Sequence, residues 1–111
     1  MKLTDFVLEY LTKLGIKTVF VVNGAAIAES IDAFSRNKDI NYVCSVHEQG
    51  AAFAAETLAK ISGKIGVAMA TSGPGGTNLL TGIANCWYDS IPCLFITGQV
   101  NSAFLSKGTP L

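Results

Sequence analysis

Charge is scarce in this sequence. Only 14% of the 111 residues are charged, eight acidic side chains balance eight basic ones, and the formal net charge is zero. A neutral chain has no long-range attraction for nucleic acid or for an anionic membrane surface, so we expect neither as a partner. Half of the residues are apolar. We therefore expect part of the surface to be covered by another chain.

The sequence also lacks long apolar runs and metal-binding patterns. No run approaches the ~18 apolar residues of a membrane-spanning helix, and residues 1–5 lack the pattern that opens a signal peptide, so we expect a cytoplasmic protein. The three cysteines, Cys44, Cys86 and Cys93, form no C-x-x-C pair, and there is a single histidine. We expect no metal site and predict buried, reduced thiols.

What the sequence does contain is an alternation of strand and helix patterns. An amphipathic pattern predicts a first helix over 3–14, ended by Gly15. Strands are expected at 17–22, 40–46, 65–70 and 93–97, with helices at 26–35, 48–61 and 77–88. The strand at 17–22 is apolar on both faces, which is typical of a central parallel strand. The alternation predicts an α/β fold, a doubly wound, flavodoxin-like parallel sheet with helices on both faces.

In such sheets, ligands bind outside the carboxyl ends of the strands. Four polar or glycine-rich segments are predicted at those ends: Asn23-Gly24-Ala25, His47-Glu48, Thr71 to Gly76, and Gly98-Gln99. They should lie along one edge of the sheet, and we expect a site there.

Glu48 falls in the first turn of its predicted helix, where the helix dipole favours a carboxylate by ~0.3–1 kcal/mol. A capping glutamate without chemistry therefore stays open as an alternative to a functional one. The adjacent His47 is expected to be a structural hydrogen-bonding residue. Trp87 and Tyr88 are expected in the core or in an interface. Four acidic residues are interpreted as solvated or helix-end charges: Glu29, Asp32, Glu56 and Asp89.

The loop Thr71-Ser72-Gly73-Pro74-Gly75-Gly76-Thr77-Asn78 is not a known phosphate-binding pattern. No lysine follows the glycines as in a Walker A loop, and Asn78 stands where the dinucleotide fingerprint has its third glycine. Taken alone, the loop is equally consistent with a tight turn between strand and helix.

In combination, these motifs resemble the N-terminal pyrimidine-binding domain of thiamine-diphosphate enzymes, with acetolactate synthase-like enzymes as the nearest relatives. The resemblance covers about residues 1–102 and is strongest at 46–52, 71–78 and 96–100. It implies that Glu48 is catalytic, hydrogen-bonding the ring nitrogen of the cofactor's aminopyrimidine and shuttling its proton. It also implies cofactor contacts at Gly24, Ala25, Pro74, Gly75 and Asn78. Ala25 departs from the family, in which proline is common at this position.

The resemblance further implies lyase or carboligase (transferase) chemistry on 2-oxo acids, with thiamine diphosphate as cofactor. The diphosphate and Mg²⁺ site belongs to a separate domain that must be supplied in cis or in trans. We therefore expect residues 1–111 to be one pyrimidine-binding domain, truncated at its C-terminus, and inactive by itself.

Two apolar helices, at 49–61 and 79–88, correspond to the family's dimer interface, so a homodimer or larger assembly is expected. Burial of these helices within their own domain is an equally good interpretation. Two other functions also stay open. One is a non-catalytic association module or remnant of such an enzyme, which would not need Glu48. The other is a nucleotide-binding flavodoxin-like domain, which the missing phosphate-binding lysine disfavours.

Overall fold

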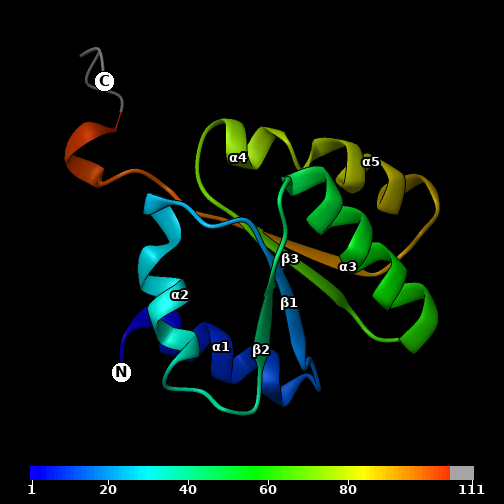
Figure 1. The fold of residues 1–111 in the computed structure, drawn as a ribbon, viewed down its shortest axis with the longest axis horizontal. Helices are drawn as coiled ribbons and strands as arrows, with labels where there is room; N and C mark the ends of the chain where they lie inside the picture. The colour runs from blue at the N-terminus through cyan, green and yellow to red at the C-terminus, as the bar shows by residue number, and fades with distance from the viewer. Residues whose placement is uncertain (106–111) are drawn as a thin grey trace.

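A four-stranded parallel sheet forms the centre of the computed structural model, which describes residues 1–105 (Figure 1). The spatial order is β2-β1-β3-β4, and all three strand pairs are parallel. The strands are β1 (Thr18–Val21), β2 (Asn41–Cys44), β3 (Gly66–Ala70) and β4 (Cys93–Thr97). The predicted α/β class, the four strands and the central place of β1 are confirmed.

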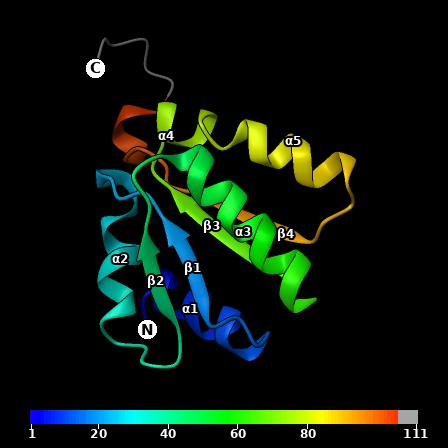
Figure 2. The same cartoon turned by 45° about the vertical axis from the view of Figure 1, so that its right-hand side comes forward.

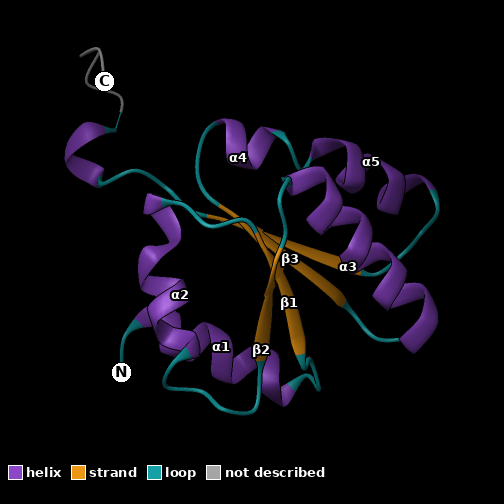
Figure 3. Cartoon of the chain, viewed as in Figure 1, coloured by secondary structure: helices purple, strands orange, loops and turns teal. Residues whose placement is uncertain are grey.

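Helices cover both faces of this sheet, as the secondary-structure colouring of Figure 3 and the turned view of Figure 2 show. The α-helices are α1 (Leu3–Lys13), α2 (Ala28–Phe34), α3 (Glu48–Ser62), α4 (Pro74–Thr77) and α5 (Leu80–Tyr88). Two short 3-10 turns, η1 (Ala25–Ile27) and η2 (Ser102–Phe104), complete the fold. Helices α1 and α2 lie on one face, and α3 and α5 lie on the other. Within residues 1–105, no helix is long and apolar enough to cross a membrane.

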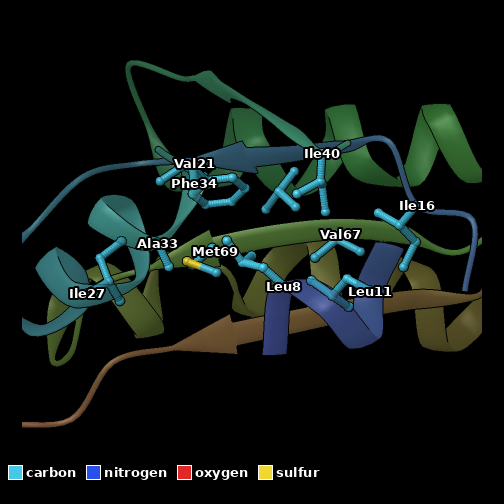
Figure 4. Close-up of a cluster of buried hydrophobic side chains, with 11 residues drawn as sticks. Leu8, Leu11, Ile16, Val21, Ile27, Ala33, Phe34, Ile40, Val67 and Met69 are labelled. Carbon is cyan, nitrogen blue, oxygen red and sulfur yellow. The ribbon is translucent and has the colours of Figure 1, made fainter. Parts of the chain in front are cut away.

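Alternation along the strands divides the interior into two cores. Val19 and Val21 of β1 face α1 and α2, in a core of large aliphatic side chains and Phe34 (Figure 4). Phe20 points the other way, toward a core that α3 supplies mainly with alanines. Because these side chains are small, α3 lies close to the sheet, and a Cβ added to Gly66 would be 1.9 Å from the carbonyl oxygen of Ala55.

The structure differs from the sequence prediction at several element ends. The second strand stops at Cys44, and Val46 is fully exposed. The helix expected at 26–35 begins as the η1 turn and becomes α-helical at Ala28. The helix expected at 77–88 is divided in two: α4 begins at Pro74, whose fixed φ suits a first helical position, and α5 follows from Leu80.

Within residues 1–105, the outer faces of α3 and α5 are not covered. Ile61 is 81% exposed, and Trp87 and Tyr88 are 81% and 84% exposed, so neither aromatic lies in the core. The inner faces of the same two helices carry alanine and glycine and pack within the domain. The chain therefore presents apolar surface on the α3–α5 side.

Candidate functional site

The four predicted segments do lie at the carboxyl ends of the parallel strands, and therefore at one edge of the sheet. The strand order places a topological switch point between β1 and β3, because the chain leaves β1 toward β2 and returns to pair β3 on the other side. Open α/β sheets bind ligands at such a point. The turn after β1 and the loop after β3 meet there.

Glu48 begins α3 directly after the β2 segment and is largely buried, with 9% of its surface exposed. Its Oε2 accepts a hydrogen bond of 3.1 Å from the side-chain amide of Asn78. Its Oε1 accepts no hydrogen bond from residues 1–105, and this oxygen is not fully buried. One carboxylate oxygen is thus fixed in place, and the other is available to a ligand.

The loop after β3 brings its glycines against this carboxylate. Gly73 has φ +61°, a conformation that side chains rarely adopt, and turns the chain into α4. Gly75 is buried, and a Cβ added there would be 2.6 Å from Cγ2 of Thr71 and 3.5 Å from Oε1 of Glu48. Gly75 therefore packs directly on the Thr71 methyl, with its backbone close to the free oxygen of Glu48.

Thr71 joins the two loops and was not singled out from the sequence. Its Oγ1 accepts a 3.2 Å hydrogen bond from the backbone N–H of Ala26. A Cβ on Gly24 would be 2.5 Å from the Cβ of Thr71, so the turn after β1 packs directly on this side chain. Gly98, after β4, approaches the same turn, since a Cβ there would be 2.4 Å from the carbonyl oxygen of Ala26. These contacts join residues more than 40 positions apart, which no local pattern reveals.

The remaining predicted residues surround this centre. Pro74 is the exposed first residue of α4, and Ala25 is exposed at the start of η1. His47 is the N-cap of α3, and its Nδ1 accepts a 3.1 Å hydrogen bond from the backbone N–H of Gln49. The prediction of a structural histidine is confirmed. Gln99 accepts a hydrogen bond from its own neighbour, the N–H of Val100.

The prediction for Glu56 was wrong. It is not solvated but 4% exposed, between α3 and α5. Its Oε2 accepts a 2.7 Å hydrogen bond from Asn85, and its Oε1 pairs with Lys60 at 2.5 Å. The bond from Lys60, and then that from Asn85, holds the pKa of Glu56 below its ordinary value despite burial. Glu29 and Asp32, in contrast, form exposed ion pairs with Lys2 and Arg36, as surface charges do.

The thiols fit the prediction only in part. Cys86 is buried and Cys93 half-buried, but Cys44 is exposed. Burial, and then the neighbouring Cys86, raises the pKa of Cys93 to about 12, so this thiol stays protonated. Across residues 1–105, no cluster of three or more His, Cys, Asp or Glu side chains is placed to hold a metal ion.

Comparison with known proteins identifies a family and several relatives of this chain. The family described as "Thiamine pyrophosphate enzyme, N-terminal TPP binding domain" matches residues 1–110. The chain is 48% identical over 96 residues (86% of its length) to the chloroplastic acetolactate synthase of Arabidopsis thaliana. It is 44% identical over 101 residues (91%) to the acetolactate synthase isozyme 1 large subunit of Escherichia coli K12. It is 43% identical over 104 residues (94%) to the acetolactate synthase large subunit of Lactococcus lactis. The matches span only 14%, 18% and 18% of these three relatives.

Proposed function

Because the chain belongs to the family of N-terminal TPP-binding domains of thiamine pyrophosphate enzymes, we propose that it forms the aminopyrimidine half of a thiamine-diphosphate site. The observation that carries this proposal is the state of Glu48. A largely buried carboxylate at the switch-point edge has one oxygen held by Asn78 and the other free beside the backbone of Gly75. A capping glutamate needs neither burial nor an amide partner.

The residues present fit the pyrimidine end of this cofactor. Oε1 of Glu48 can accept a proton from, or return it to, a ring nitrogen. Asn78 keeps the carboxylate from rotating while this happens. Gly24 and Gly75 both pack on the side chain of Thr71. This packing brings the backbone around Ala25 and Pro74 to the edge that carries Glu48, where it would contact the ring. When bound, thiamine diphosphate supplies the acidic thiazolium carbon that reacts with a 2-oxo acid. General acid–base residues of this kind contribute ~10²–10⁴-fold in rate.

The proposed whole-protein activity is of the acetolactate synthase type, lyase or carboligase (transferase) chemistry on 2-oxo acids. It needs a diphosphate-binding domain with Mg²⁺, in cis or in trans, since the matched relatives are several times longer than the chain. We further propose that residues 1–111 are a single pyrimidine-binding domain and that the chain functions as a homodimer or larger assembly. Its cytoplasmic location stays a prediction from the sequence.

A second candidate function is a non-catalytic association module. The observation in its favour is the apolar outer surface of α3 and α5, with Trp87 and Tyr88 more than four-fifths exposed. Such a module uses the fold to pair with another chain and makes no use of a free carboxylate oxygen on Glu48.

A chimera separates the two candidates. The matched segment of this chain replaces its counterpart in the E. coli isozyme 1 large subunit, with which it is 44% identical. If the chain is a half-site, the purified chimera forms acetolactate, and the rate depends on added thiamine diphosphate. A folded, correctly assembled chimera that forms no acetolactate would favour the association module.

A further inference from the structure

Glu56 is a buried charge that the proposed cofactor site does not use. Buried carboxylates are costly unless they are paired, and this one is fully partnered, by Lys60 on one oxygen and Asn85 on the other. The two partners differ in what they connect. Lys60 lies on α3 itself, one turn further on, whereas Asn85 reaches across from α5.

The hydrogen bond between Asn85 and Glu56 resembles the one between Asn78 and Glu48, since in both an asparagine amide donates to a glutamate of α3. Glu48 of α3 accepts from Asn78 at 3.1 Å, and Glu56 of α3 accepts from Asn85 at 2.7 Å. The acids are eight residues apart and the amides seven, spacings that keep each pair near one face of its helix and ~10–12 Å apart along it. Both bonds therefore join the same two segments, which run side by side in Figures 1 and 2.

The connection from Asn85 back to Asn78 is short and helical. Asn78 (φ −68°, ψ −13°) and Leu79 (φ −79°, ψ −17°) keep helix-like backbone angles between α4 and α5. The N–H of Ile83 donates to the carbonyl of Leu79 at 3.0 Å, which continues α5 toward the site. A shift of α5 along α3 is thus transmitted to the Asn78 amide.

Between the two bonds, α3 and α5 are in close contact. A Cβ on Gly82 of α5 would be 2.3 Å from the Cβ of Ala52 on α3. The close approach sets the distance between the helices. The two hydrogen bonds, unlike this contact, are directional.

We propose that the Glu56–Asn85 hydrogen bond is a positioning contact for Glu48, holding α5 in the register at which Asn78 reaches Oε2 of Glu48. A role of this contact in catalysis rests on the proposed function. The coupling between the two hydrogen bonds is independent of that function. Lys60, which is half exposed and joins no second helix, neutralises Glu56 without contributing to the register.

Four variants of the 111-residue chain separate positioning from general stability. Asn85→Ala and Glu56→Met each remove the inter-helix bond, and methionine spares the interior an unpaired charge. Lys60→Met removes the ion pair but keeps the bond from Asn85. Glu56→Gln keeps an acceptor oxygen for Asn85 and loses only the charge.

The readout is the Asn78 side-chain amide in ¹⁵N-asparagine-labelled protein, assigned by its loss in Asn78→Asp. Without cofactor, we expect its exchange with water to be ~2–30-fold faster in Asn85→Ala and Glu56→Met, the range for a coupling passed between neighbouring contacts. In Lys60→Met and Glu56→Gln it should stay within about twofold of the unmutated chain.

Folded Asn85→Ala and Glu56→Met variants with unchanged Asn78 exchange would overturn the proposal. Equal acceleration in Lys60→Met would also overturn it, since loss of stability alone would then explain the effect. If both bond-removing variants failed to fold, the bond would be a general requirement of the fold, and a specific positioning role would be contradicted. Because no cofactor is present, failure here is distinct from failure of the proposed role of Glu48.

Discussion

Gly82→Ala tests the close packing of α3 against α5. By itself, alanine favours a helix over glycine by ~1 kcal/mol. The new methyl would, however, lie 2.3 Å from the Cβ of Ala52 and 3.4 Å from its Cα, whereas carbon atoms pack at ~3.5–4.0 Å. The helices must therefore separate. Since part of the obstacle is backbone, we expect the upper end of the ~1–3 kcal/mol cost of overpacking.

The net expected loss is ~2 kcal/mol in the free energy of unfolding, or a fall of ~10 °C in Tm for a domain of this size. The double variant Ala52→Gly/Gly82→Ala moves the methyl from one helix to the other, and the helix propensities of the two changes cancel. We expect it to lie within ~1 kcal/mol of the unmutated chain and above both single variants, a coupling of ~2–3 kcal/mol.

Urea denaturation followed by circular dichroism measures these values, at one fixed protein concentration because association changes apparent stability. A Gly82→Ala variant as stable as the unmutated chain would show that the helices have room for a methyl group. A double variant no better than the single ones would show that the clash lies elsewhere.

Three further predictions concern other parts of the molecule. Arg36 and Lys60 lower the pKa of the carboxyl groups of Asp5, Asp32 and Glu56. The ionised carboxylates therefore stabilise the fold above about pH 4.5, and the free energy of unfolding should decrease as the pH falls further. Constant stability down to about pH 3 in acid denaturation would contradict this. Trp87→Ser with Tyr88→Ser should shift the chain toward monomer in sedimentation, and an unchanged distribution would place the interface elsewhere. Thr71→Val, which loses the acceptor for Ala26, should raise the thiamine diphosphate concentration for half-maximal chimera activity ~5-fold, and Thr71→Ser should raise it less.

Sequence patterns predicted the elements because strand and helix periodicity is local. The run Thr18–Val21 is β-branched and aromatic with apolar side chains on both faces, and it is indeed a central strand. The placement of Glu48 and the Gly73–Gly75 loop at one edge followed from the strand ends alone. Their direct approach to each other is a fact that only the structure provides.

What the sequence did not reveal depends on contacts distant along the chain. Glu56 has the same appearance in a helical pattern as a surface glutamate, and its burial follows from Asn85, 29 residues away. Charged substitutions at Ala52 or Ala55, natural choices for testing an interface from the sequence, would instead disrupt the core, since both are fully buried. The exposed Trp87 and Tyr88 are the appropriate probes.

We expect the free oxygen of Glu48 to exchange a proton with the bound cofactor, and the decisive variant is Glu48→Gln in the chimera at saturating thiamine diphosphate. The amide keeps the shape and an oxygen for Asn78 but cannot carry the proton, so the rate of acetolactate formation should fall ~10²–10⁴-fold. Thermal stability should stay close to that of the unmutated chimera, and Glu29→Gln, at an exposed ion pair, should keep full activity. Near-normal turnover by Glu48→Gln would show that Glu48 does not carry this proton.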